Sequence, residues 1–364
     1  MPRPDAPRPE MSRVRLDEPS WWYGPGDAWQ ARLLIPAAKL WGHIAERRWA
    51  GAKPVDVGIP VICIGNFTAG GTGKTPLSLH IAATVQRMGR TPVFLTRGYG
   101  GRLKGPHRVD VEHDSAGDVG DEPLLLARLA PVTLARDRAS GARAIAATGP
   151  ATDVIIMDDG LQNPALRKDL TIAVVDGRRG IGNRRVIPAG PLRAPLAAQL
   201  PRVDAVVINH PAHAEVGAAD AGAWFRQHFN GSVLDATTVP DGDLSWLDAK
   251  PVIAYCAIGA PQRFFGLLRS LGASVVREIT FPDHHPFTER EAAEILAAAR
   301  AAGAVLATTE KDWVRLDASR TEQRALKVQS RPIMIKMVFA QSEQQRLQRL
   351  IEAALVARTC GSSA

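Results

Sequence analysis

The sequence predicts an α/β fold in which a mostly parallel sheet is flanked by helices, together with a second, smaller α/β domain. Two observations support this prediction. From residue 59 to about 208, short apolar runs of strand length alternate with loops and helix-length segments, which is typical of a buried parallel sheet. A second series of the same kind begins near residue 251. With 364 residues, of which 45% are hydrophobic, the chain is long enough for two cores or one large one.

The first series consists of apolar runs with a helix after the first of them. The expected strands are 59–65, 91–96, 154–157, 171–175 and 205–208, and the helix is expected at about 75–88. In the second series we expect strands at 251–255, 273–276, 304–308 and 333–337, with helices at 263–271, 288–302 and 342–357. Residues 211–250 are less regular, so we place the domain boundary near 230–250.

This organisation divides the chain into four segments. A disordered leader is expected over 1–20, which is rich in Pro and Arg and lacks the apolar centre of a secretory signal. A Trp-rich, basic segment covers 21–50. The first domain is expected over 51–235 and the smaller C-terminal domain over 236–364.

The segment 21–50 contains five of the eight tryptophans of the chain. A helix starting after Pro36 would place Leu40, Trp41 and Ile44 on one face. Tryptophan and cationic residues on a short amphipathic segment suit a membrane interface. Packing of the aromatic stripe against the protein core explains the same residues equally well.

Composition narrows the classes of partner. The formal net charge of +8 suits nucleic acid, an anionic membrane or a phosphorylated substrate, although an Arg-rich composition alone would also produce it. The three cysteines are far apart and form no CxxC pair, which argues against a zinc site. No apolar run reaches 18 residues, so no membrane-spanning helix is expected.

A glycine-rich loop follows the first apolar run. Its end, Gly73-Lys74-Thr75, matches the phosphate-binding pattern G-x-x-x-x-G-K-[ST], whereas Thr68 replaces the first glycine. Between a strand and a helix, the N–H groups of such a loop cradle a triphosphate. The fold is therefore expected to be P-loop NTPase-like. The residues predicted to bind ATP are Thr68, Ala69, Gly70, Gly71, Thr72, Gly73, Lys74 and Thr75, with Lys74 at the β- and γ-phosphates.

Two adjacent carboxylates, Asp158 and Asp159, follow the apolar run 154–157. Their mutual repulsion is costly unless a divalent cation lies beside them. Asp-Asp-Gly is also a turn sequence, but the glycine-rich loop upstream favours the metal interpretation. We therefore expect Mg²⁺ to be held by Asp158, Asp159 and the hydroxyl of Thr75.

A kinase also needs a base and positive charge beside the triphosphate, and several strings could supply them. They are Arg97-Gly98-Tyr99-Gly100-Gly101, Gly120-Asp121-Glu122-Pro123, Asp283-His284-His285 and the basic stretch 166–202. The string Glu310-Lys311-Asp312 lacks the spacing of the N/T-K-x-D motif, which argues against guanine recognition. Two alternatives stay open at this point: a P-loop ATPase that drives a protein or nucleic-acid partner, and a membrane-binding scaffold.

The order of these strings resembles one family. Ile64-Gly65-Asn66 and Gly70-Gly71-Thr72-Gly73-Lys74-Thr75-Pro76 are followed by Thr96-Arg97-Gly98-Tyr99-Gly100, Gly120-Asp121-Glu122-Pro123, Asp158-Asp159-Gly160-Leu161-Gln162 and Pro188-Ala189-Gly190-Pro191-Leu192-Arg193, with a further match over 281–285. Together they resemble tetraacyldisaccharide 4′-kinase, the lipid A 4′-kinase of Gram-negative bacteria.

The resemblance implies that ATP, with Mg²⁺, phosphorylates the 4′-hydroxyl of a tetraacyl-glucosamine disaccharide 1-phosphate. It also implies a peripheral enzyme on the cytoplasmic face of the bacterial inner membrane, whose partners are that acylated lipid and the anionic membrane surface. No nucleic-acid partner and no obligate protein partner is expected. Because a tetraacyl substrate stays in the bilayer, the membrane interpretation of residues 21–50 gains weight.

The resemblance also assigns roles to residues. Asp121 and His284 match a catalytic pair, in which a carboxylate holds an imidazole base in place. Lys74 is expected to act in catalysis, and Arg193 matches an arginine that stabilises phosphate. The residues expected at the substrate are Arg97, Tyr99, Gln162 and Asn183. The sequence departs from the family pattern at two positions, Asn163 and Ala194. At position 194 the family often has a glutamate.

Overall fold

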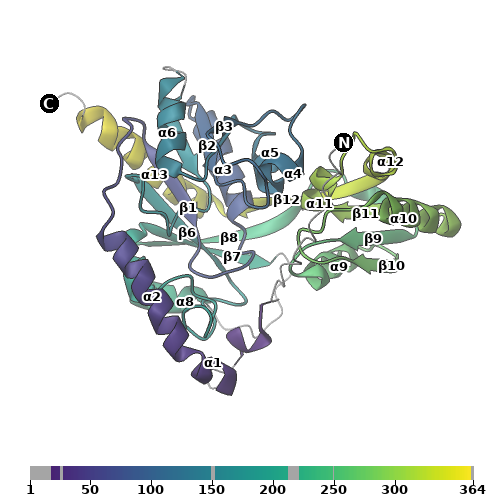
Figure 1. The fold of residues 1–364 in the computed structure, drawn as a ribbon, viewed down its shortest axis with the longest axis horizontal. Helices are drawn as coiled ribbons and strands as arrows, with labels where there is room; N and C mark the ends of the chain where they lie inside the picture. The colour runs from purple at the N-terminus through teal and green to yellow at the C-terminus, as the bar shows by residue number, and fades with distance from the viewer. Residues whose placement is uncertain (1–17, 25–27, 149–151, 212–220, 249, 362–364) are drawn as a thin grey trace, which may run out of the picture.

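The computed structural model describes residues 18–24, 28–148, 152–211, 221–248 and 250–361 of the chain (Figure 1). Its strands are β1 (Val61–Gly65), β2 (Pro92–Thr96), β3 (His107–Arg108), β4 (Val132–Leu134), β5 (Val154–Met157), β6 (Leu170–Asp176), β7 (Ala205–Pro211), β8 (Ser232–Asp241), β9 (Val252–Cys256), β10 (Val275–Thr280), β11 (Val305–Thr309) and β12 (Ser330–Phe339).

Helices connect and cover these strands. They are α1 (Trp29–Leu33), α2 (Ile35–Ala50), α3 (Lys74–Arg87), α4 (Ala116–Val119), α5 (Asp121–Leu126), α6 (Arg138–Ala147), α7 (Leu196–Gln199), α8 (Ala221–His228), α9 (Pro261–Ser270), α10 (Glu289–Ala302), α11 (Glu310–Arg315), α12 (Thr321–Gln329) and α13 (Gln341–Gly361). Short 3-10 helices lie at Ser20–Trp22, Leu200–Arg202 and Ser245–Leu247.

The described strands form one twelve-stranded sheet in the order β10-β9-β11-β12-β8-β7-β6-β1-β5-β2-β4-β3. Along this order, each strand from β8 to β4 is parallel to its neighbours within that run (β8-β7-β6-β1-β5-β2-β4). The same holds for the run β10-β9-β11-β12. The two parallel blocks meet where β12 pairs antiparallel with β8. Figure 1 shows β9, β10 and β11 with their helices on one side of the molecule. We call these elements, β9–β11 and α9–α12, the second body, and the remaining part the first body.

Alternating side chains of each buried strand pack against opposite helix layers. In β1, Ile62 and Ile64 lie in a core with α3 and α13, whereas Val61 and Cys63 pack towards α6. The second body repeats the arrangement, with α10 and α12 over one face of its strands and α9 over the other. Burial on both faces explains why these strands are nearly continuous apolar runs.

The mostly parallel α/β sheet predicted from the sequence is confirmed. Every predicted strand is present, with ends that differ by a few residues. Three strands were not predicted: β3, β4 and β8. β8 lies inside the segment 211–250, where Thr, Pro and Asp gave no clear pattern. Its pairing between β7 and β12, and not its composition, makes it a strand.

The division into two domains stays a prediction, but the last helix belongs to the first body. Leu347 and Ile351 of α13 are fully buried and lie in the same core as Ile62 and Leu77. The C-terminal segment 236–364 is therefore shared between the two bodies.

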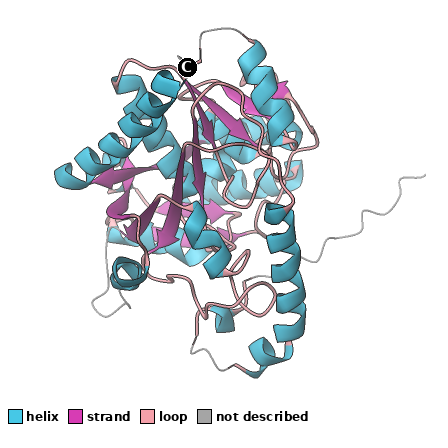
Figure 2. Cartoon of the chain, turned by 90° about the vertical axis from the view of Figure 1, so that its left-hand side faces the viewer, coloured by secondary structure: helices cyan, strands magenta, loops and turns pink. Residues whose placement is uncertain are grey.

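Most of the predicted leader, residues 1–17, lies outside the described residues. The helix expected after Pro36 is present as α2, and Figures 1 and 2 both show it as a long helix on the outside of the first body. Among the described residues, no helix combines the length and the hydropathy needed to cross a bilayer.

Candidate active site

The glycine-rich loop lies where the sequence places it, between the end of β1 at Gly65 and the start of α3 at Lys74. β1 is parallel to its neighbours β5 and β6. Because the loop follows the C-terminal end of β1, it lies at the carboxyl edge of the sheet, where α/β proteins bind ligands. Gly73 precedes α3 with φ of 102°, a conformation that favours glycine. A Cβ atom there would also lie 2.5 Å from Nδ2 of Asn209.

Neighbouring segments hold the loop in place. The amide of Asn209, on β7, donates to the carbonyl of Thr72 over 3.0 Å. The backbone N–H of Ala69 donates to the carbonyl of Pro191 over 2.8 Å, and the Arg193 N–H donates to that of Phe67 over 2.9 Å. These contacts fix the loop before any nucleotide binds, which reduces the entropy cost of binding.

Arg193 links the loop to the acid pair. Its Nε donates to the carbonyl of Thr68 over 3.0 Å, and its Nη1 lies 2.7 Å from Oδ1 of Asp159. Lys74 Nζ lies 3.7 Å from the same Asp159 oxygen. Burial acts to raise the pKa of Asp159, but the charges of Lys74 and Arg193 outweigh it and lower that pKa to about 2.

The environment of Asp158 shifts its pKa in the opposite direction, upward. Its Oδ1 accepts a hydrogen bond of 2.8 Å from Ser78 Oγ, while its Oδ2 is buried and has no hydrogen-bond partner among the described residues. Burial, followed by the charges of Glu122 and Asp159, raises the pKa of Asp158 to about 6. A buried carboxylate oxygen of this kind is costly to leave unpaired.

The donor set at this position fits Mg²⁺. The unpaired oxygen of Asp158 lies at the edge that carries the loop, and Thr75 is buried at the start of α3. Within the described part of the chain, no cluster of three His, Cys, Asp or Glu residues could form an all-protein cage. Mg²⁺ commonly takes one or two carboxylates and completes its shell with substrate phosphates and water. The residues present therefore suit a magnesium ion that binds together with a nucleotide.

Asp121 and His284, predicted as a pair, lie next to each other across the two bodies. Asp121 starts α5 in the first body, and His284 follows β10 in the second. His284 Nδ1 is 3.2 Å from Asp121 Oδ2. The His284 backbone, with φ of 60°, donates its N–H to the carbonyl of Ala257 over 3.0 Å. Tyr99 packs against the imidazole edge-on, with 5.7 Å between ring centroids.

A third residue, Arg315, joins this pair and was not predicted. Its Nη2 and Nε donate to Asp121 Oδ2 over 2.5 and 3.1 Å. Burial acts to raise the pKa of Asp121, but the hydrogen bond from His284 and the charges of Arg315 and Lys311 hold that pKa well below its ordinary value. The carboxylate is therefore ionised at neutral pH and can only accept hydrogen bonds.

The residues predicted at the substrate have different surroundings. Arg97 is exposed just after β2, and Tyr99 is exposed beside His284. Gln162 donates to the carbonyl of Asn66 and to the side chain of Gln199, both over 2.8 Å. Asn183 donates to the carbonyl of Ala189 over 2.9 Å and so shapes its own loop. A substrate role for these four residues stays a prediction.

Sequence reasoning missed four residues of the site: Ser78, Arg138, Asn209 and Arg315. Arg138 is buried at the start of α6 and donates to the backbone carbonyl of Asp158 over 3.3 Å. Each of the four becomes relevant only through its neighbours in the fold. A signal existed for Arg315 alone, because the charged string 310–312 directly follows an expected strand and thus falls at a ligand-binding edge.

Comparison with known proteins identifies the family to which this chain belongs. The family model described as tetraacyldisaccharide-1-P 4′-kinase matches residues 30–355. Among curated proteins named tetraacyldisaccharide 4′-kinase, that of Nitrobacter winogradskyi is 48% identical over 302 residues, covering 83% of this chain and 87% of the relative. That of Bradyrhizobium sp. is 49% identical over 309 residues, covering 84% and 86%.

The fold agrees as well. A crystal structure of LpxK from Aquifex aeolicus in complex with ATP aligns with a TM-score of 0.68 and 26% identity, covering 89% of this chain and 99% of that one. The family model extends from before the glycine-rich loop into the last helix, and each of these two relatives matches more than four fifths of the chain. The chain therefore belongs to the tetraacyldisaccharide-1-P 4′-kinase family.

Proposed function

We propose that His284 and Asp121 supply the base with which this chain, a tetraacyldisaccharide 4′-kinase, transfers the γ-phosphate of ATP to the 4′-hydroxyl of its lipid A precursor, a tetraacyl-glucosamine disaccharide 1-phosphate. The evidence for the activity is that the chain belongs to this family. The observation that supports the base is the 3.2 Å approach of His284 Nδ1 to the buried carboxylate of Asp121. The alternative of an ATPase that drives a partner loses its support, since the relatives are named as kinases of this lipid.

The proposed role of His284 depends on its two neighbours at Nδ1, the Asp121 carboxylate at 3.2 Å and Arg315 Nη2 at 3.3 Å. In the proposed reactive state Nδ1 carries the proton and faces the ionised carboxylate, so that Nε2 has a free lone pair. The 4′-hydroxyl oxygen attacks the γ-phosphorus and its proton passes to Nε2. As the new O–P bond forms, the bond between the γ-phosphorus and the β,γ-bridging oxygen breaks, and ADP leaves.

The phosphates are proposed to lie on residues 68–75, with Lys74 at the β- and γ-phosphates and Arg193 beside the transferring group. Both cations already flank Asp159, within 3.7 and 2.7 Å. Thr75 and Asp158 would hold Mg²⁺, with Asp159 next to them. When bound, the ion neutralises charge that develops on the phosphate oxygens.

A peripheral position on an anionic membrane is the proposed location, with α1 and α2 as the docking surface. The side chains of Trp29, Leu33, Leu40, Trp41 and Ile44 are 47–71% exposed. Ala38, Gly42 and Trp49 of the same helix are buried against the protein. The two interpretations of the sequence thus apply to different faces of one helix, since only the inner face packs on the core.

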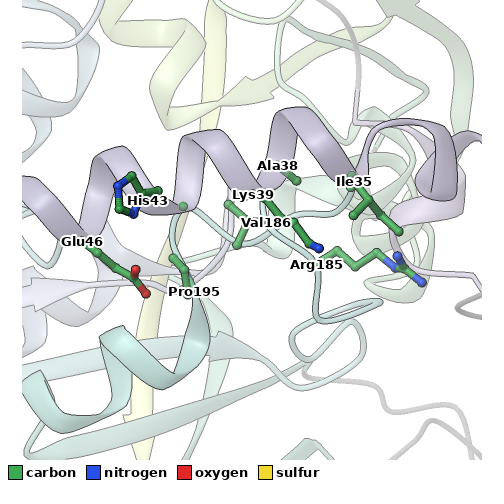
Figure 3. Close-up of a pocket in the computed structure, with 10 residues that line it drawn as sticks. Ile35, Ala38, Lys39, His43, Glu46, Arg185, Val186 and Pro195 are labelled. Atoms are coloured by element: carbon green, nitrogen blue, oxygen red, sulfur yellow. The ribbon is translucent and has the colours of Figure 1, made fainter.

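A pocket of about 380 Å³ lies between this helix and the loop that leads to Arg193 (Figure 3). One wall is α2, with Ile35, Lys39 and His43, and the other includes Arg185 and Val186. Aliphatic and cationic groups lie beside one carboxylate, that of Glu46, and the cationic groups suit a lipid whose headgroup carries phosphate. We propose that the acylated disaccharide reaches the site past this pocket.

The proposed base is tested with purified full-length protein, ATP, Mg²⁺ and the tetraacyl disaccharide 1-phosphate in detergent. We expect Asp121→Ala and His284→Ala each to lower kcat by about 10²- to 10⁴-fold, while the Kd for ATP stays near the wild-type value. Product is measured by mass spectrometry, and His113→Ala is the control, because this exposed histidine pairs with Asp110 and not with a residue of the site. Wild-type turnover in both variants would show that the base lies elsewhere.

A further inference from the structure

We infer that Arg315 is a positioning residue for phosphoryl transfer: it crosses from the second body to hold the Asp121 carboxylate in the orientation that aligns His284. This inference rests on the proposed function of the Asp121–His284 pair and deepens it. Arg315 ends α11, whereas Asp121 starts α5, so the contact joins two elements far apart in the chain. The side chains of Arg315 and Asp121 are only 6% and 3% exposed.

The guanidinium grips the carboxylate with two of its nitrogens. Nη2 and Nε of Arg315 both donate to Asp121 Oδ2, the oxygen that also faces His284 Nδ1, and Nη2 lies 3.3 Å from that same Nδ1. The other oxygen, Oδ1, accepts from the backbone N–H of Glu122 over 2.9 Å. Four donors therefore fix one carboxylate, and its rotation is blocked. An immobile acceptor is what keeps the imidazole in one orientation.

The third guanidinium nitrogen of Arg315, Nη1, contacts the backbone that positions His284. Nη1 donates to the carbonyl of Ala257 over 2.8 Å, and that same carbonyl accepts the backbone N–H of His284. Nη1 also donates to Asp312 Oδ1 over 2.6 Å. Asp312 in turn accepts the N–H of Ala257 over 3.1 Å. One guanidinium thus connects the carboxylate to the backbone that positions the imidazole.

The charges around Asp121 explain why a cation is required. Arg315 and Lys311 approach from α11, and His284 from the loop after β10. Two further carboxylates are close by: Glu122, the next residue on α5, which pairs with Lys311 at 2.8 Å, and Asp312 on α11. Asp283, beside His284, lies 3.7 Å from the far side of the imidazole. Without Arg315, Asp121 and Asp312 would be buried with one cation fewer, which favours protonation of Asp121.

A lysine would not replace this arginine. The planar fork reaches Asp121, Asp312 and Ala257 at once, whereas an ammonium group is a single point at the end of a flexible chain. Arg315→Lys therefore keeps the charge but loses the connection between the carboxylate and the Ala257 carbonyl. We expect it to retain the fold and to lose part of kcat.

The experiment measures kcat, KM for ATP and the pH dependence of kcat/KM for the full-length wild type, Arg315→Gln and Arg315→Lys. For Arg315→Gln we expect kcat to fall roughly 10- to 100-fold, with the KM for ATP unchanged. The acid limb of the pH profile is expected to move up by about one pH unit or more, because the Asp121–His284 pair loses a neighbouring cation that opposes its protonation. Added guanidinium ion should restore part of kcat to Arg315→Gln and none to the wild type.

The control is Arg128→Gln, which removes a different ion pair to α11, that with Glu310, and leaves Asp121 untouched. It should keep wild-type kcat and an unchanged acid limb. In the Asp121→Asn background, Arg315→Gln should add little further loss, because its effect passes through Asp121. Should Arg315→Gln fail to fold, Arg315→Lys carries the test: we expect a partial loss of kcat with an acid limb near that of the wild type, because the charge is kept and only the connection to the Ala257 carbonyl is lost.

Two outcomes separate this inference from the function on which it rests. Wild-type turnover in Asp121→Asn would remove the catalytic pair and the role of Arg315 with it. An impaired Asp121→Asn beside an unimpaired Arg315→Gln would overturn the role of Arg315 alone. A loss in Arg315→Gln that adds fully to that of Asp121→Asn, or that raises the KM for ATP, would also overturn it, since a general structural defect acts in this way.

Discussion

At the scale of single residues, the two adjacent carboxylates after β5 contribute to stability with opposite signs. Burial raises the pKa of Asp158 to about 6, so the folded protein binds this proton more tightly than the unfolded chain does. Stability from this group therefore falls as pH rises from its ordinary 3.8 to about 6, and it stays lower above that range. The cost at neutral pH is at most about 3 kcal/mol.

We expect Asp158→Asn to raise the Tm of the metal-free protein at pH 8, because the variant removes a buried charge that has an unpaired oxygen. It should also lose the increase in Tm that Mg²⁺ with a non-hydrolysable ATP analogue gives the wild type. Differential scanning calorimetry in EDTA and in Mg²⁺ measures both effects. An unchanged response to Mg²⁺ would mean that Asp158 does not hold the ion.

Asp159→Asn is the matched comparison. Lys74 and Arg193 overcome the effect of burial and lower the pKa of Asp159 to about 2, so its stabilising effect is present above pH 3.8 and is lost as pH falls through about 2. The same amide substitution one residue further along should therefore lower Tm at pH 8. Equal changes in the two variants would contradict the assigned environments.

The sequence predicted the residues whose type and spacing are themselves distinctive, and it missed those that act through their neighbours. Lys74, Asp158 and Asp159 could be predicted as site residues because a glycine-rich loop and a paired acid are local patterns. Arg315 was missed because a charged residue on a short helix is usually exposed to solvent, and its contact with Asp121 bridges 194 positions. Only the three-dimensional fold places it next to a carboxylate.

At the scale of elements, α2 illustrates what amphipathic patterns can and cannot decide. The sequence indicated an aromatic and cationic helix but did not say which side packs on the protein. The structure buries Ala38, Gly42 and Trp49 and leaves Leu40 and Ile44 exposed. Trp41 lies between these two faces: its side chain is half-exposed, and its Nε1 donates to the carbonyl of Arg193 over 3.1 Å.

The outer face of this element carries a prediction. We expect the double variant Leu33→Glu/Leu40→Glu to bind vesicles containing phosphatidylglycerol roughly tenfold more weakly or worse, because two exposed apolar side chains become charged. Vesicle co-sedimentation measures this. Val328→Glu, at a side chain of α12 that is 79% exposed, is the control and should bind like the wild type. Undiminished binding of the double variant would contradict docking through α1 and α2.

At the scale of the whole molecule, elements far apart in the sequence build one core in the first body. The core around β1 is closed by α13, which starts at Gln341, more than 270 positions after β1 ends. Leu347, Ile351, Ala354 and Leu355 supply its contribution. The first body therefore cannot complete its core before the second body has been synthesised, and this long-range closure is intrinsically slow.

This closure makes α13 part of the stability of the nucleotide site, since Ile81 and Leu77 of α3, the helix behind the loop, lie in the same core. We expect Leu347→Ala to lower the free energy of unfolding by about 2–5 kcal/mol, as for other fully buried leucines. Leu350→Ala is the matched control on the same helix, because Leu350 is only partly buried against that core and should lose less. Urea unfolding followed by circular dichroism gives both values, and the Kd for an ATP analogue below the transition should stay near wild type. Equal, small losses in the two variants would mean that α13 lies on the first body without closing its core.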